Sequence, residues 1–101
     1  MTYNVVYDVQ APIEAYHALH AAVREVIGSS DVGMLAHIGR PTETGFQVIE
    51  VWESKERLDD FNRDLMAPVM AKFASDGPPP ALELREFELC GLVIPSAGLW
   101  V

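Results

Sequence analysis

The fold is decided by the stretch GFQVIEVWES, from Gly45 to Ser54, and by KERLDDFNRDLMAPVMAKF, from Lys55 to Phe73, which follows it directly. The first part is rich in aromatic and β-branched residues, which favours a strand from Gly45 to Glu53. Ser54 suits a helix N-cap, because its hydroxyl can accept a hydrogen bond from a free backbone N–H. Apolar residues then recur at helical spacing. The stretch therefore predicts a strand followed by one long helix that folds back over it.

The remaining chain predicts three further strands and one further helix. The expected elements are a strand at 3–9, a helix at 13–27 that ends at Gly28, a strand at 33–40, and a long last strand at about 82–94 with a bulge or bend near Cys90. A proline-rich run at 75–80 separates the second helix from the last strand. The order β-α-β-β-α-β predicts an α+β, ferredoxin-like domain over 1–101, with both helices on one face of a four-stranded antiparallel sheet.

The segment VIEVWESKE, from Val48 to Glu56, with Phe61 following, resembles the dimeric α+β-barrel superfamily and its antibiotic-biosynthesis-monooxygenase-like group. By element order the resemblance extends over nearly the whole chain. It implies a homodimer and the cofactor-independent oxidation of phenolic, polyketide-like molecules in a cavity between sheet and helices. The family uses an Asn, a Trp and a Tyr there, and Asn62, Trp52 and Tyr7 are residues of these kinds.

Haem-degrading relatives use an Asn on the first strand, which Asn4 resembles, and a His on the second helix. This chain has no histidine after His37, so its sequence departs from the haem-degrading pattern. Other dimeric barrels are isomerases or have no known catalysis.

Composition narrows the list of partners. The chain has 101 residues and a formal net charge of −8, and it has no basic run. Nucleic acid and anionic membranes are therefore not expected as partners. No apolar run is long enough to span a bilayer. The single cysteine, Cys90, cannot form an internal disulfide, which fits a cytoplasmic protein, and its apolar surroundings suggest a buried side chain.

Apolar residues on both faces of the predicted sheet indicate a second copy of the chain as partner. In the central strand, Phe46 and Val48 point one way, while Ile49 and Val51 point the other. Helices cover one face only, so the other face needs a partner. The apolar end Gly98–Val101 supports the same homodimer, because a free terminus with this composition is expected to dock on something.

Three residues are candidate catalytic groups: Glu50, His37 and Asn4. Glu50 shares a strand face with apolar neighbours, and a buried carboxylate must find a partner or change its pKa. Buried carboxylates often mark functional sites, but a carboxylate in a structural ion pair is buried as well. If Glu50 has a structural role, Arg40 or Arg85 is its expected partner. His37 is either a general base or a strand histidine hydrogen-bonded across the sheet.

Trp52, Phe61 and Met66 are candidate substrate-binding residues around an apolar cavity, with core packing as the alternative role of the aromatic rings. His17 and His20 share a helix face with Glu14, but the sequence offers no second set of ligands, so no metal is predicted. No cofactor is expected either.

The sequence leaves three hypotheses open. The first is a cofactor-free oxygenase, or a related small enzyme, that acts on a neutral, planar, apolar molecule. The second is a binding module that holds such a ligand without turnover. The third is a structural dimer whose cavity is filled by its own side chains. A partly polar cavity between sheet and helices would exclude the third.

Overall fold

The computed structural model describes residues 2–73 and 81–101. Its main elements are β1 (Tyr3–Val9), α1 (Ile13–Ile27), β2 (Met34–Pro41), β3 (Phe46–Trp52), α2 (Lys55–Phe61), η1 (Asn62–Met66), α3 (Ala67–Phe73) and β4 (Leu82–Glu86). The chain ends with β5 (Val93–Ile94), the short 3₁₀ helix η2 (Pro95–Ala97) and β6 (Leu99–Trp100). The proline-rich run predicted at 75–80 lies outside the described residues.

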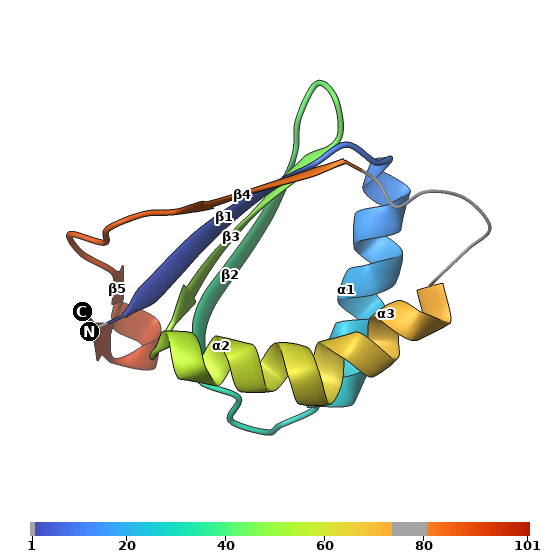
Figure 1. The fold of residues 1–101 in the computed structure, drawn as a ribbon. Coiled ribbons are helices and arrows are strands. Elements are labelled where there is room, and N and C mark those ends of the chain that lie inside the picture. Colours follow the sequence, from blue (N-terminus) through green and yellow to red (C-terminus); the bar gives the residue numbers. More distant parts are fainter. Residues whose placement is uncertain (1, 74–80) are drawn as a thin grey trace.

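The four long strands form one antiparallel sheet in the order β2-β3-β1-β4, and the helices lie on one side of it (Figure 1). The ferredoxin-like prediction is therefore confirmed. A buried cluster joins the sheet to α2: Val5 and Trp52 from the two central strands pack with Leu58 and Phe61. Helix α1 stands further out, and none of its fifteen residues is buried. The core thus lies between the central strands and α2.

The predicted long helix from Lys55 to Phe73 is a continuous helical run with a π-helical segment in its middle. Ser54 caps it as expected, since its Oγ accepts a hydrogen bond from the backbone N–H of Arg57 at 3.2 Å. In η1 the N–H of Ala67 bonds to the carbonyl of Asn62, five residues earlier. Pro68 follows directly and has no N–H to offer. A widened turn is one way to pass such a residue without breaking the helix.

A bulge in β2 changes which face Met34 occupies. Strict alternation along a strand at 33–40 would put Met34 on the same face as Ala36 and Ile38, but the register shifts between Met34 and Ala36, which makes Leu35 the extra residue. Met34 consequently lies opposite Trp52 and packs on the helix-facing cluster. From Ala36 to Pro41 the pairing with β3 continues without a further shift.

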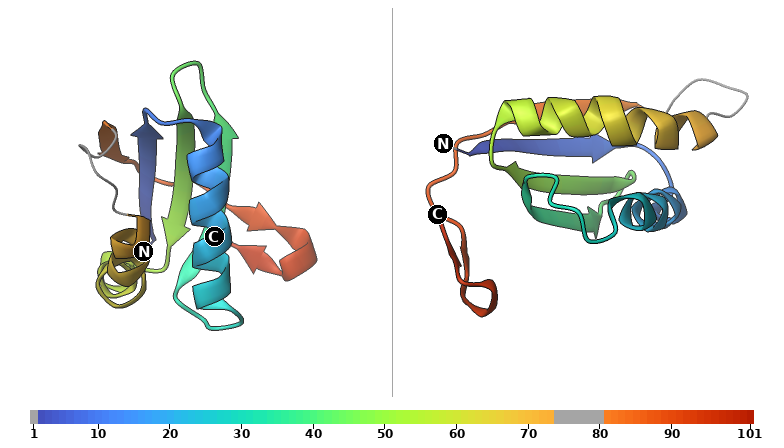
Figure 2. Two further views of the ribbon diagram at one scale, coloured as in Figure 1. Left: turned by 90° about the vertical axis from the view of Figure 1, so that its right-hand side faces the viewer. Right: turned by 90° about the horizontal axis from the view of Figure 1, so that it is seen from below.

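The predicted long last strand is wrong in its second half. Pairing with β1 ends at Glu86, and the chain resumes as a separate hairpin of β5 and β6, which projects from the body of the domain (Figure 2). The hairpin ends are joined by paired hydrogen bonds between Leu92 and Val101. Cys90 lies in the irregular connection and is exposed, so the expectation of a buried thiol is also wrong. Its apolar neighbours do not form a strand that would enclose it.

Candidate functional site

Glu50 is a buried carboxylate on the helix-facing side of the sheet, with 9% of its surface exposed. It lies in register with Val5 on β1 and His37 on β2, so its side chain emerges at the centre of the sheet. Both oxygens are engaged: Oε1 accepts from Nε1 of Trp52 at 3.0 Å, and Oε2 lies 3.0 Å from Nδ1 of His37. The buried charge is therefore held by two hydrogen bonds.

The hydrogen-bonded chain continues from the sheet to α1. Nε2 of His37 lies 2.9 Å from the hydroxyl of Tyr16, which in turn lies 3.4 Å from Nδ1 of His20. If His37 is neutral, its Nδ1 carries the proton toward the carboxylate, and Nε2 accepts from the Tyr16 O–H. Burial decreases outward: Trp52 is fully enclosed, the His37 side chain is 25% exposed, and His20 is exposed.

All three histidines of the chain surround the ring of Tyr16. Their ring centroids lie 5.8 Å (His17), 5.4 Å (His20) and 6.0 Å (His37) from that of Tyr16. The ring also packs on Phe46 at 5.4 Å. Gly39 makes room for it, because a Cβ at this position would overlap the Tyr16 ring. The side chain of Tyr16 thus packs α1 closely against the sheet.

Two tyrosine hydroxyls near the carboxylate are held in their protonated form. Burial, and after it the charge of Glu50, raises the pKa of Tyr16 above its usual range. The same two causes, in the same order, raise the pKa of Tyr7 still further. Both side chains are therefore phenols, and hydrogen-bond donors, at neutral pH.

The predicted aromatic residues form the wall of this region. Trp52 has no exposed surface, and its ring packs on Phe61 at 5.1 Å with the planes 50° apart. Met66 is half-buried and packs against the same cluster. In this structure Trp52 offers its N–H to Glu50 and no open face to a ligand.

Asn4 is not part of this arrangement. It lies in register with Val51 and faces the side of the sheet away from the helices, whereas Glu50 faces the helices. Its Nδ2 donates to the carbonyl of Phe87 at 3.1 Å, and its buried Oδ1 has no hydrogen-bond partner within the described residues. The structure thus brings Glu50, His37 and Trp52 together and leaves Asn4 apart.

The arginines proposed as partners of Glu50 bind elsewhere, and that expectation is corrected. Arg40 donates to Gln47 at 2.8 Å, and Arg85 donates to Asp8 at 2.6 Å. Gln47 also donates to Asp8 at 3.0 Å, so a polar row crosses all four strands on the face away from the helices. Strand alternation separates both arginines from Glu50.

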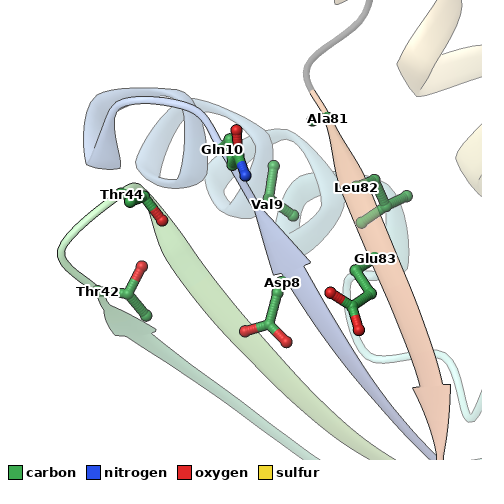
Figure 3. Close-up of a pocket in the computed structure, with 8 residues that line it drawn as sticks. All are labelled: Asp8, Val9, Gln10, Thr42, Thr44, Ala81, Leu82 and Glu83. Carbon is green, nitrogen blue, oxygen red and sulfur yellow. The ribbon is translucent and has the colours of Figure 1, made fainter.

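A shallow hollow of about 440 Å³ lies at the far end of β1, next to the β2–β3 turn and the start of β4 (Figure 3). Its lining is mixed, with Asp8, Gln10 and Glu83 beside Val9 and Leu82. Glu50, His37 and Tyr16 are not among its lining residues. This hollow is separate from the hydrogen-bonded chain.

The sequence analysis did not single out Tyr16, which lies among the apolar residues of the first helix. A usable signal was present, since Tyr16 and His20 are four residues apart and therefore lie on one helical face. Within residues 2–73 and 81–101, no three His, Cys, Asp or Glu side chains come together in a way that could hold a metal ion. None of the helices in these ranges has the length and apolar character needed to cross a bilayer.

No protein-family model matches the sequence, and no curated protein matches it. Solved structures do match the fold. SnoaB, a cofactor-independent oxygenase from Streptomyces nogalater, superposes with a TM-score of 0.60 at 12% identity over 93% of this chain and 95% of that one. The haem-degrader MhuD from Mycobacterium tuberculosis, solved with two haems in its active site, gives 0.57 at 18% identity over 91% and 98%. A Nitrosomonas europaea protein of unknown function gives 0.60 at 18% identity over 93% and 97%.

These likenesses confirm in fold the resemblance drawn from the Val48–Glu56 segment. The chain has the ferredoxin-like fold of these solved structures, SnoaB and MhuD among them. At these identities the comparison carries the fold alone, and any reaction has to be argued from the residues of the site.

Proposed function

We propose that the protein is a cofactor-independent oxygenase that acts on a neutral, planar, largely apolar aromatic molecule between the sheet and the helices. The observation that carries the proposal is the buried Glu50–His37 pair on the helix-facing surface. A carboxylate that orients an imidazole makes that imidazole an effective base, as in other acid–base sites. The oxygenase among the fold relatives, SnoaB, supports the same reaction class.

The chemistry asked of the pair is removal of one proton from an activated C–H or O–H group of the substrate. The resulting anion is electron-rich enough to reduce O₂ directly. In the overall reaction a CH₂ group and O₂ give a carbonyl group and water, so atoms and electrons balance without a further reductant. The enclosed Trp52–Phe61 wall keeps the region apolar, which strengthens each electrostatic contact inside it. The net charge of −8 disfavours anionic ligands.

Oxygen uptake tests this proposal. The purified protein is incubated in air with a panel of neutral two- and three-ring phenols and ketones, and the product is checked by mass spectrometry for gain of one oxygen and loss of two hydrogens. We expect turnover that His37→Gln lowers by roughly a hundredfold or more, the usual scale of a general base. His17→Gln, at an exposed histidine of α1, is the matched control and should retain most of the rate. Turnover that is equal in both variants would contradict the assignment of His37.

Binding without turnover is the second candidate function. It is favoured by the closed hydrogen bonding of Trp52, Glu50 and His37, whose polar groups already satisfy one another. A ligand that raises the melting temperature without any oxygen uptake would support this function over the first. The two measurements are therefore made on the same samples.

We also propose that two copies pair through the open sheet face, the one away from the helices. This face carries Val6, Ile38 and Ile49 in one register row, and Ile38 is 54% exposed. The projecting hairpin adds exposed apolar side chains, with Trp100 71% exposed. Burying such surface is worth about 25 cal/mol per Å². Sedimentation should show a dimer at micromolar concentration, and deletion of residues 97–101 should weaken it; a wild-type monomer would contradict the proposal.

A further inference from the structure

Among the described residues of the hydrogen-bonded chain from Glu50 to Tyr16, the Tyr16 oxygen is the atom that can accept a further hydrogen bond. The Glu50 oxygens are buried and engaged, and both nitrogens of His37 have partners at 3.0 and 2.9 Å. The Tyr16 oxygen donates its single proton to His37, and it keeps two acceptor positions. Next to these acceptor positions lies Nδ1 of His20, 3.4 Å from the Tyr16 oxygen, which is a long hydrogen-bond distance. An incoming proton donor can therefore bind at Tyr16 without breaking a short hydrogen bond.

We propose that the Tyr16 hydroxyl, and not the His37 ring, is the group that exchanges a proton with a bound molecule, with His37 and Glu50 as the base behind it. Glu50 and His37 already belong to the proposed oxygenase site. The identity of the bound molecule therefore rests on the proposed function. The arrangement of carboxylate, imidazole and hydroxyl is that of an activated-hydroxyl triad, recognised by geometry and not by sequence position.

The proton movements balance within these residues. As a ligand proton moves to the Tyr16 oxygen, the phenolic proton moves to Nε2 of His37. The positive charge that forms on the imidazole lies next to the Glu50 carboxylate, 3.0 Å away, which stabilises it. The reverse transfer gives the proton to the peroxide that the ligand anion forms with O₂, and the proton leaves in the water when the carbonyl group forms. Burial and the charge of Glu50 raise the pKa of Tyr16, so the hydroxyl starts as a phenol that needs a base.

The position of the Tyr16 ring is fixed on several sides. Phe46 packs on it from β3, and Gly39 on β2 leaves the space that its ring and hydroxyl occupy. Tyr7 on β1 is the other phenol near the carboxylate, and the exposed His17 and His20 are the remaining titratable rings beside it on α1. A ring so restricted presents its oxygen in one geometry, which proton transfer requires.

A ligand-independent experiment tests the triad. N-acetylimidazole transfers its acetyl group to tyrosine: the phenolic oxygen forms a bond to the carbonyl carbon, the bond to imidazole breaks, and the phenolic proton leaves through the base to the departing imidazole. Acetylation of Tyr3, Tyr7 and Tyr16 is followed by peptide mass spectrometry on the folded protein. We expect Tyr16 to react roughly tenfold faster than Tyr3, because the Tyr16 hydroxyl has the His37 imidazole as its base, whereas the hydrogen bond of Tyr3 goes to the carboxylate of Glu86, a weaker base that raises the pKa of Tyr3 to about 12.

His37→Gln should lower the Tyr16 rate by roughly tenfold, and the matched variant His17→Gln, at an exposed ring on the same helix, should change it less than about twofold. A Tyr16 rate no higher than that of Tyr3 in the wild-type protein overturns the proposal, and so does a rate that His37→Gln leaves unchanged. If His37→Gln does not fold, as judged by circular dichroism, the comparison of tyrosines within the wild-type chain decides alone.

The oxygen-uptake assay separates this proposal from the proposed function. Tyr16→Phe should lower turnover about tenfold or more, whereas the matched hydroxyl deletion Tyr3→Phe should not. Fast Tyr16 acetylation with no oxygen uptake on any compound rejects the oxygenase and keeps the triad. Oxygen uptake that Tyr16→Phe leaves intact keeps the oxygenase and rejects the role of Tyr16.

Discussion

Replacing Glu50 with glutamine should reverse the direction of the hydrogen-bonded chain without unfolding the protein. The Gln carbonyl oxygen can still accept from Trp52, but its amide then faces Nδ1 of His37 with N–H groups. His37 must therefore move its proton to Nε2 and donate to the Tyr16 oxygen. The Tyr16 O–H is then free to turn toward Nδ1 of His20, 3.4 Å away. Every polar group keeps a partner, but Tyr16 loses the base that the Glu50 carboxylate supports.

The energy follows from the two bonds that change character. A hydrogen bond to a charged group contributes about 1.5–3 kcal/mol and a neutral one about 0.5–1.5, so two replacements remove roughly 2 kcal/mol. Part of this is recovered because a neutral amide costs less to bury than a carboxylate. We expect Glu50→Gln to lower the free energy of unfolding by about 1 kcal/mol. Glu50→Ala should lower it by roughly 3–5 kcal/mol, because Trp52 and His37 lose their buried acceptor.

Urea denaturation of the two variants measures the free energies, and ¹⁵N NMR of labelled histidine reports which nitrogen of His37 carries the proton. The wild-type protein should show the proton on Nδ1, and Glu50→Gln should show it on Nε2. Tyr16 acetylation should fall with it. The reasoning is refuted if Glu50→Gln is as unstable as Glu50→Ala, or if His37 keeps its proton on Nδ1.

Three further changes probe the surroundings. Gly39→Ala should lower stability by about 1–3 kcal/mol, because its Cβ overlaps the Tyr16 ring, and the loss should shrink in a Tyr16→Ala background; thermal unfolding of the four proteins checks this. Pro68→Ala should raise the free energy of unfolding by about 1 kcal/mol, since it restores an N–H inside the helical run, and an unchanged urea midpoint would contradict it. The raised pKa of Tyr7 means that the folded state holds the phenolic proton more tightly than the unfolded chain does, so stability should fall as pH rises above about 10. Urea titrations at two pH values measure this fall, and Tyr7→Phe should reduce it.

The sheet and its two-sided character could be predicted from sequence because strand alternation is a strong local signal. The register that brings Glu50 opposite His37 follows from the hairpin of β2 and β3, and the burial of Glu50 follows from its apolar neighbours. Asn4 lies on the other face for the same reason, since strand alternation separates it from Glu50. A shared sheet face is therefore stronger evidence that two residues lie close together in a site than their presence in the same sheet alone.

Three local features could not be predicted from the sequence pattern. The bulge at Leu35 moves Met34 across the sheet, but nothing in the local sequence marks it. The π-helical turn before Pro68 depends on how the helical run accommodates a missing donor. The last strand stops at Glu86, opposite Val5, although the apolar pattern continues and β1 still has two residues, Asn4 and Tyr3, beyond that point; Phe87 bonds to Asn4, to its carbonyl and to its side-chain amide.

Tyr16 shows why a site can be hidden within a correct secondary-structure prediction. A tyrosine in an apolar stripe reads as core, and its ring does pack on Phe46 as core residues do. Its hydroxyl, however, ends the chain that starts at Glu50, and a helix with no buried residue gives that hydroxyl a half-exposed position. Tyr16 thus packs α1 against the sheet with its ring, and its hydroxyl proton is hydrogen-bonded to the His37 of the Glu50–His37 pair. Substitutions that move α1 should therefore alter the reactivity of Tyr16 before they alter the core, which the ratio of Tyr16 to Tyr3 acetylation can report directly.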